Sequence, residues 1–343
     1  MGKNLIGTIR YMGNKSKLID FIVPKIIKIT DQGGIVCDLM AGTNSVSYAL
    51  KEKYTIYTND IQEYSYIIGK AIIENQDEII NKETAIIELG KYIEDNKKNN
   101  YYNFFISEYA DTYFSKEQCK DIDSIRYAIS KVKNEYRQAL YLLALMNTMS
   151  KLQSTTGHYA QFMPSNHKRI IPLQQISLQE KFYSITEKYH EITKSNYNNK
   201  SFCMDYRQLL KLEDIKKIQT LYLDSPYTSE QYSRFYHLLE TLVKYDYPKL
   251  SYKAKYRDGR FKSSFCYANK VKEEFSYIFK FSRDNSINIV VSYSTTGIMN
   301  YEELLKLCKS YFNKVELDML PYKHSTLGKG TQEKNEIVIT CIN

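Results

Sequence analysis

The sequence lacks tryptophan, has only five histidines, and places no two of its six cysteines near enough to form a zinc knuckle or a redox motif. The cysteines are spread along the whole chain, as Cys37, Cys119, Cys203, Cys266, Cys308 and Cys341. The histidines do not cluster either. We therefore expect reduced core cysteines, no metal, and no chemistry that runs through a cysteine nucleophile.

Long apolar runs are also missing. The strongest apolar run, 141–146, is far too short to span a bilayer, and the first residues lead into no apolar segment. These absences predict a cytoplasmic protein that does not enter a membrane.

What the chain has in excess is positive charge and tyrosine. It carries 48 basic and 39 acidic residues among 343, which gives a formal net charge of +9. Such a surplus indicates an anionic partner, and nucleic acid is the commonest one. The 33 tyrosines supply aromatic faces with a polar tip. Those faces can lie beside phosphates or bases, although codon bias would produce the same count.

Alternating strand and helix patterns predict an α/β fold with a mainly parallel sheet covered by helices. Short apolar runs of strand type occupy 35–39, 54–58, 220–223, 287–293, 314–317 and 336–341. Helical patterns occupy 46–51, 235–245, 267–283 and 300–311. The final strand is expected to pair as a hairpin through the loop around Gly328 and Gly330.

A long stretch without strand pattern interrupts this alternation. From about 63 to 189 the segments are helical and rich in lysine, glutamate and asparagine, for example 122–150, and a polar loop at 154–161 interrupts them. We therefore expect a catalytic domain in two parts, 1–62 and 199–343, separated by a mainly helical insertion at 63–198.

Two motifs indicate a nucleotide-like ligand. Residues 38–45, Asp-Leu-Met-Ala-Gly-Thr-Asn-Ser, form a strand end and a small-residue turn that opens a helix, and glycine there lets a ligand approach the backbone. Asp60 ends the next strand, where a carboxylate can accept the two hydroxyls of a ribose. Taken singly, the turn could be ordinary and Asp60 could be a helix cap. Their order and spacing favour the ligand site.

The third motif is 221–228, Leu-Tyr-Leu-Asp-Ser-Pro-Tyr-Thr, an apolar strand that runs into a proline loop. An amino group on an aromatic ring is a poor nucleophile, because its lone pair is delocalised into the ring. Acceptors for both of its protons, the Asp224 carboxylate and the Ser225 carbonyl, would localise that lone pair. Pro226 keeps Ser225 extended, and Tyr227 offers a face on which an extruded base can stack. The alternative is a strand that merely ends in a proline turn.

The three motifs together resemble the adenine-N6 DNA methyltransferases of the Dam-like, D12 class. Residues 10–18, Arg-Tyr-Met-Gly-Asn-Lys-Ser-Lys-Leu, look like the N-terminal motif of that family, and 202–206 like its adenine-recognising segment. The stretches 231–237 and 289–294 look like its later motifs. The resemblance implies a Rossmann-like, S-adenosylmethionine-dependent methyltransferase sheet with an inserted helical recognition domain. It covers nearly the whole chain outside 63–200.

The resemblance also implies the cofactor and its site. The expected cofactor is S-adenosyl-L-methionine, and the residues that match the family's binding positions are Tyr11, Lys15, Asp38, Ala41, Gly42, Thr43, Asn44, Asp60, Ile61, Asp205, Tyr206 and Asp224. The catalytic set is Asp224, Ser225, Pro226 and Tyr227.

Two positions depart from the family pattern. Ser225 stands where proline is usual, but any residue supplies the carbonyl, so weaker preorganisation and not inactivity is expected. Asn44 stands where glycine is usual, and asparagine tolerates left-handed backbone better than most residues.

The candidate DNA contacts come from two polar regions. The loop 154–168 within the insertion is the candidate for sequence readout, and the stretch 253–262 mixes cations with aromatics, as phosphate-contacting loops do. A plain solvated loop is the alternative for each. The residues expected at DNA are His158, Tyr159, Lys168, Lys253, Lys255, Arg257 and Arg260.

The function predicted from these motifs is site-specific methyl transfer to adenine N6 in duplex DNA by base flipping, without metal or covalent intermediate. The expected partners are double-stranded DNA and a cognate restriction endonuclease. An RNA adenine-N6 methyltransferase and a catalytically weak, methyltransferase-like DNA-binding module remain alternatives. A cytosine-N4 enzyme is disfavoured, because its loop usually opens with serine and this one opens with Asp224.

Overall fold

The structure is a computed structural model that describes residues 9, 11, 13–322 and 334–343. The chain forms two compact units, and each is built from three segments. We call one the helical unit (Met1–Asn14, Gln62–Lys194 and Ser233–Arg260) and the other the sheet unit (Lys15–Ile61, Ser195–Tyr232 and Phe261–Asn343).

The sheet unit is built on a seven-stranded sheet with the order β3-β2-β1-β4-β7-β9-β8. The strands are β1 (Ile35–Asp38), β2 (Thr55–Asp60), β3 (Lys200–Cys203), β4 (Thr220–Leu223), β7 (Asn288–Ser294), β8 (Lys314–Tyr322) and β9 (Lys334–Ile342). The pairs from β3 to β7 are parallel, and β9 lies antiparallel between β7 and β8. The predicted, mainly parallel sheet is therefore confirmed.

The sheet contains one strand that the sequence did not predict, and one predicted connection lies outside the described residues. Strand β3 was not expected, because its four residues are all half-buried and carry no alternation of apolar and polar side chains. The antiparallel pairing of β8 with β9 is as expected. The loop around Gly328 and Gly330, through which they were expected to join, lies outside the described residues.

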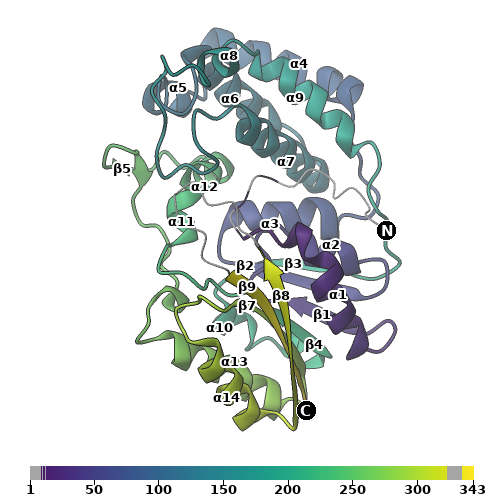
Figure 1. The fold of residues 1–343 in the computed structure, drawn as a ribbon. Coiled ribbons are helices and arrows are strands. Elements are labelled where there is room, and N and C mark those ends of the chain that lie inside the picture. The colour runs from purple at the N-terminus through teal and green to yellow at the C-terminus, as the bar shows by residue number, and fades with distance from the viewer. Residues whose placement is uncertain (1–8, 10, 12, 323–333) are drawn as a thin grey trace. The chain divides into compact units, whose positions relative to one another are not determined.

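Helices cover both faces of this sheet (Figure 1). Helices α1 (Ile19–Lys28) and α2 (Ser45–Leu50) lie on one face, and α13 (Val271–Asp284) and α14 (Tyr301–Tyr311) lie on the other. Helix α13 turns Phe275, Ile278 and Phe279 into the core, at the spacing that places side chains on one helical face. The shorter elements of the unit are η1 (Lys15–Lys17), α10 (Tyr206–Leu209), η4 (Glu213–Lys217) and η5 (Ser264–Cys266).

The helical unit contains most of the expected insertion. Its elements are α3 (Glu63–Gly69), the π-helical η2 (Lys70–Glu74), α4 (Lys82–Asn99), α5 (Phe104–Glu108), α6 (Lys116–Ile129), α7 (Glu135–Leu152), α8 (Ile171–Gln174), α9 (Leu178–Thr186), η3 (Glu187–Tyr189), α11 (Tyr232–Phe235, from Ser233 on), α12 (His237–Lys244), and the hairpin strands β5 (Leu250–Ser251) and β6 (Tyr256–Arg257). Within the expected helical stretch 122–150 one helix ends at Ile129 and another begins at Glu135. The break is fixed by Asn134, whose side chain accepts the backbone N–H groups of Tyr136 and Arg137.

One segment of the helical unit comes from the part of the chain expected to be purely catalytic. Residues Ser233–Arg260 pack with the insertion helices and not with the sheet. The guanidinium of Arg126, on α6, donates to the carbonyls of Leu242 and Val243 at 2.8 and 2.9 Å, which ties the end of α12 to α6. Among the described residues, no helix combines the length and apolarity that a membrane crossing requires.

Candidate active site

Three carboxylates lie at the carboxyl edge of the parallel strands. Asp38 ends β1, Asp60 ends β2, and Asp224 directly follows β4. Strand β1 pairs with β2 on one side and with β4 on the other, so the chain order reverses direction between β1 and β4. Ligands of open α/β sheets bind at such a switch point, outside the carboxyl ends of the strands. The fold therefore gathers the predicted motifs at one edge of one unit.

The turn after β1 has the backbone that the sequence suggested. Gly42 and Asn44 both have left-handed backbone, with φ of 51° and 58°. The expectation that asparagine takes the left-handed conformation where the family has glycine is confirmed. The turn is held in place by the Gly42 N–H, which donates to Asp60 Oδ2 at 3.0 Å, and by the Ala41 N–H, which donates to the Asn59 carbonyl at 2.9 Å. Asp60 thus orients the turn as well as facing the site.

Asp38 is buried at the base of this turn. The Ser47 hydroxyl donates to its Oδ2 at 2.6 Å, whereas Oδ1 has no hydrogen-bond partner among the described residues. Burial raises the pKa of Asp38 to about 7, and the nearby Asp224 and Asp60 charges raise it further while the Ser47 hydrogen bond opposes them. Burying a carboxylate oxygen without a hydrogen-bond donor costs free energy. Oδ1 of Asp38 is therefore suited to a ligand that supplies a hydrogen-bond donor or a positive charge.

The segment after β3 lies beside β2. The Asp205 side chain accepts the Arg207 N–H at 2.8 Å and so begins α10. The Tyr206 hydroxyl donates to Glu274 of α13. Ile61 is half-buried, and its carbonyl accepts the Cys203 thiol at 4.0 Å. Each of these positions therefore has a structural partner in addition to its predicted contact with a cofactor.

The loop after β4 contains a buried ion cluster. Lys15 Nζ lies 3.2 Å from Asp224 Oδ1 and 3.4 Å from Glu336 Oε2, a carboxylate on β9. The side chains of Lys15 and Glu336 are 5% and 2% exposed, and that of Asp224 is 20% exposed. Only Asp224 in this cluster therefore presents appreciable surface to a ligand. Lys15 Nζ also lies 5.1 Å from the centroid of the Tyr227 ring.

These contacts set the protonation of the loop. Burial raises the pKa of Asp224 to about 6, although the Lys15 charge opposes the shift. Burial also raises the pKa of Tyr227 to about 12. Burial alone would lower the pKa of Lys15, but the charges of Asp224, Tyr227 and Glu336 outweigh it and raise that pKa well above its usual value. At neutral pH the cluster holds one ammonium between carboxylates.

The remaining loop residues are positioned by backbone contacts. The Ile298 N–H donates to the Tyr227 carbonyl at 3.0 Å, and the Tyr227 ring meets the Tyr293 ring edge-on at 5.9 Å. Ser225 is buried, and its hydroxyl has no hydrogen-bond partner among the described residues. The assignment of the Ser225 carbonyl as a hydrogen-bond acceptor stays a prediction.

Sequence comparison assigns these motifs to a known family. The family model described as D12 class N6 adenine-specific DNA methyltransferase matches residues 11–307, which include the turn, the three carboxylates at the strand ends and the proline loop. The chain belongs to this family. Its sheet is accordingly the Rossmann-like sheet of a methyltransferase.

Individual relatives are type II modification enzymes by name. The modification methylase StsI of Streptococcus sanguinis is 30% identical over 92% of this chain and 48% of its own length. The type II methyltransferase M.FokI of Planomicrobium okeanokoites is 30% identical over 96% of this chain and 51% of its own length. This D12-class chain therefore spans about half of those two relatives. It matches 94% of the type II methyltransferase M.NlaIII of Neisseria lactamica, at 26% identity.

One predicted cofactor residue of this D12-class chain belongs to the other compact unit. Tyr11 lies in the helical unit, where its ring stacks on Tyr236 at 4.4 Å and its hydroxyl accepts a hydrogen bond from Tyr64 at 3.3 Å. Lys15, four positions later in the same motif, lies in the sheet unit. The N-terminal motif is therefore divided between the two units.

The predicted DNA contacts all lie in the helical unit, but they differ in exposure. Lys168 and Lys253 are exposed, and Arg260 is half-buried with its guanidinium 4.7 Å from the centroid of the Tyr256 ring. None of these three forms an ion pair with a residue that the structure describes. These three side chains are therefore the ones with charge to offer a phosphate.

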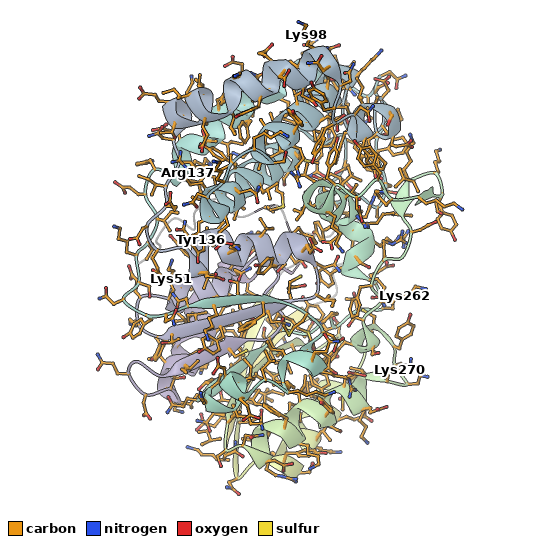
Figure 2. All side chains as sticks on the ribbon, turned by 180° about the vertical axis from the view of Figure 1, so that it is seen from behind. Lys51, Lys98, Tyr136, Arg137, Lys262 and Lys270 are labelled. Carbon is orange, nitrogen blue, oxygen red and sulfur yellow. The ribbon has the colours of Figure 1, made fainter. Side chains whose placement is uncertain are left out.

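The two polar regions also contain residues of other kinds. His158, in the loop of the insertion, is half-buried against Phe235, with ring centroids 4.8 Å apart. Lys262, the last residue of the basic stretch, is exposed, and its side chain extends outward from the ribbon (Figure 2). It belongs to the sheet unit, whereas 253–260 belong to the helical unit. The basic stretch, like the N-terminal motif, therefore continues from one unit into the other.

Three other predicted DNA contacts are engaged inside the unit. Tyr159 is 1% exposed, and its carbonyl accepts the Tyr113 hydroxyl at 2.7 Å. Arg257 is 8% exposed and forms a two-point ion pair with Asp246 at 2.7 and 3.1 Å. The Lys255 ammonium donates to the Glu108 carbonyl. We therefore correct these assignments: Tyr159 packs in the core, Lys255 ties the β5–β6 hairpin to the end of α5, and Arg257 pairs with Asp246.

Sequence reasoning missed two polar residues at the strand ends. The buried Asn59 side chain donates to the carbonyls of Leu39 and Met204 at 3.2 and 3.1 Å and so joins the ends of β1 and β3. Glu336, the second carboxylate on Lys15, stands just before the apolar run Ile337–Ile339 of β9, more than 100 positions after the proline loop. A glutamate at the start of an apolar run is the one signal that could have marked it.

Proposed function

We propose that this chain transfers a methyl group from S-adenosyl-L-methionine to N6 of an adenine flipped out of duplex DNA. The observation that carries the proposal is the half-buried Asp224 on a proline-held loop, at the switch point of the sheet and next to the left-handed turn after β1. The names of the relatives support membership of a restriction–modification system, with a cognate endonuclease as partner.

The cofactor would lie at the turn after β1. The residues fit it: Asp38 has a buried carboxylate oxygen without a partner among the described residues, and Gly42 and Asn44 hold the backbone of the turn in left-handed conformation. Asp60 would accept the ribose hydroxyls, and Asp205 with Tyr206 would hold the adenine ring. When bound, the cofactor supplies an electrophilic methyl group on a sulfonium. The proposed site within the sheet unit also includes Lys15, Ala41, Thr43 and Ile61. The contact of Tyr11 with the cofactor stays a prediction from the sequence.

The loop would prepare the nucleophile. Asp224 and the Ser225 carbonyl accept hydrogen bonds from the two N6–H groups, which localises the nitrogen lone pair toward the methyl group, and Tyr227 stacks on the flipped base. Asp224 must be ionised to serve as this acceptor. Because the pKa of Asp224 is about 6, the rate at saturating cofactor should fall as the pH drops through that value.

The test of the proposed function is methyl counting on defined substrates. The protein is incubated with labelled S-adenosylmethionine and either duplex DNA, single-stranded DNA or RNA, and the products are digested and separated by nucleoside. We expect label in N6-methyladenine from duplex DNA. Label in N6-methyladenine from RNA alone, label in N4-methylcytosine, or binding to DNA without any label would each contradict the proposal.

Asp60→Ala should weaken S-adenosylmethionine binding by about 1.5–3 kcal/mol, the usual value of a hydrogen bond to a charged group. The substitution removes two interactions at once, because Asp60 also accepts the Gly42 N–H that holds the turn. Calorimetry with the cofactor measures the effect, and DNA affinity serves as the control, which should not change. Unaltered cofactor affinity would remove Asp60 from the site.

We propose that the helical unit holds the duplex and reads its sequence. Its candidate phosphate contacts are three of the predicted cations, Lys168, Lys253 and Arg260, which form no ion pair with a described residue. The β5–β6 hairpin also presents Tyr252, which is 82% exposed and has left-handed backbone at φ 63°. A bulky residue in that conformation is strained, and such strain concentrates at functional sites. The half-buried His158 and its loop remain the candidates for readout.

Replacing Lys168, Lys253 and Arg260 together by alanine should weaken binding to all duplexes alike. The log–log salt dependence should flatten by about 0.9 for each phosphate that is no longer neutralised, while the methylated sequence stays the same. The matched control is the triple alanine variant of Lys91, Lys131 and Lys133, three cations that line a hollow on the same unit. Equal weakening in the two triple variants would show a general effect of charge, and a changed target sequence would assign readout to the first set.

A further inference from the structure

We propose that Glu336 is a positioning residue for the transfer, which acts on Asp224 through the Lys15 ammonium that both carboxylates share. This inference rests on the proposed function, because it assigns a role within the same loop. Glu336 is placed on β9, where it pairs with Ser294 of β7 and Leu320 of β8, and its Oε2 lies 3.4 Å from Lys15 Nζ.

The position of Glu336 is not one that folding alone favours. Its side chain is 2% exposed, and the strand continues with the buried residues Ile337, Val338 and Ile339. A carboxylate in such a place must be compensated, and a buried ion pair seldom stabilises a fold more than apolar residues of the same volume would. The charge of Glu336 therefore calls for a purpose other than packing.

The geometry supplies one. Lys15 lies between two carboxylates, with 3.2 Å to Asp224 and 3.4 Å to Glu336, so the ammonium is held from both sides. An ammonium held by Asp224 alone would withdraw charge from the carboxylate that must accept the N6 proton. Glu336 takes part of that interaction, and its negative charge opposes the effect of the ammonium on Asp224. Asp224 is thereby kept a stronger acceptor while Lys15 stays fixed.

Several other groups face Asp224 and must be separated from Glu336. Asp38 acts on it from the end of β1, and Tyr222 and Tyr227 flank it on its own segment. Asp38 belongs to the proposed cofactor site, so its titration should affect cofactor binding. A rate measured at saturating cofactor and DNA excludes that contribution. Both tyrosines have raised pKa values and stay neutral over the acidic range.

The experiment is the pH profile of kcat for the full chain with duplex DNA, in the wild type and in Glu336→Gln. The acidic limb of the wild type reports Asp224. Removing a negative charge near that carboxylate favours its ionised form, so the limb should move to lower pH in Glu336→Gln. The plateau rate should fall by about tenfold, because the acceptor is weaker and Lys15 is held from one side only. The KM values for cofactor and DNA should not change.

The matched control is Glu316→Gln. Glu316 lies on the neighbouring strand β8 and forms an ion pair with Lys28 at 2.6 Å, so the substitution removes the same charge from the same sheet. Its limb and plateau should match the wild type. Glu336→Asp retains the charge but shortens the side chain by one methylene. The acidic limb of its kcat profile should lie between those of the wild type and Glu336→Gln. If Glu336→Gln does not fold, Glu336→Asp takes its place in the experiment.

The outcomes separate the two proposals. A wild type that methylates no nucleic acid contradicts the proposed function itself. A wild type that transfers methyl groups, with an acidic limb that stays in place in Glu336→Gln and Glu336→Asp, overturns the role of Glu336. A lower plateau without a shift of the limb also overturns it, since impaired packing alone would produce that result.

Discussion

Asp224→Ala should lower kcat by about a thousandfold, the scale of the loss when one preorganised group that stabilises a transition state is removed. The carboxylate is the side-chain acceptor for the N6 proton in the proposed reaction, and the Ser225 carbonyl cannot replace it because it serves the other proton. Affinity for S-adenosylmethionine should be partly retained, since the turn after β1, Asp38 and Asp60 still hold the cofactor.

The variant should remain folded, which makes the measurement interpretable. Lys15 keeps Glu336 as a partner at 3.4 Å, so no buried ammonium is left alone. Single-turnover methyl transfer to duplex DNA gives the rate, and calorimetry gives the cofactor affinity. Asp224→Asn is the matched variant of equal size, and its rate should fall by a similar factor because an amide is a weaker acceptor than a carboxylate. A rate within tenfold of the wild type in either variant would contradict the assignment of Asp224.

The fold was largely predictable because its strands are short apolar runs whose lengths suit a buried sheet. The strand at 220–223 has the bounds that its sequence indicates, and the expected strands at 35–39 and 54–58 are displaced by only one or two residues. Ligand-facing residues at the ends of parallel strands follow from the same pattern, because those ends meet at one edge. The left-handed conformation at Asn44 could be predicted for a local reason, the small energetic cost of that backbone for asparagine.

What could not be predicted depends on long-range packing. Nothing local to Tyr159 distinguishes it from a surface tyrosine, and its burial accompanies contacts with the distant residues Tyr113, Phe235 and His237. On α12, the ring nitrogen Nε2 of His237 forms a hydrogen bond with the Tyr159 carbonyl at 2.9 Å. The assignment of Ser233–Arg260 to the helical unit has the same cause. Charge patterns identified Arg257 as a cation but could not show that Asp246 already neutralises it.

Lys15→Met should lower the free energy of unfolding by about 3–5 kcal/mol at pH 8, the usual cost when one partner of a buried ion pair is removed. Methionine fills most of the volume of the lysine side chain. The loss of unfolding free energy therefore results from the missing charge and not from a cavity. Two carboxylates, Glu336 at 2% exposure and Asp224 at 20%, would then lose the ammonium that they share. Denaturant titration with and without the substitution measures the difference.

The pH dependence of that deficit distinguishes its electrostatic origin from a packing defect. Without the ammonium, burial and the charge of Glu336 hold the folded-state pKa of Asp224 still further above its unfolded value, so the folded variant binds more protons than the unfolded chain does. Its stability relative to the wild type should therefore recover as the pH falls from 8 toward 5. The control Lys25→Met breaks a partly exposed ion pair with Asp318 at 2.6 Å and should cost about 0–1 kcal/mol. A Lys15→Met deficit that is equally large at pH 8 and pH 5 would show that the lysine stem, and not its charge, supports the catalytic loop.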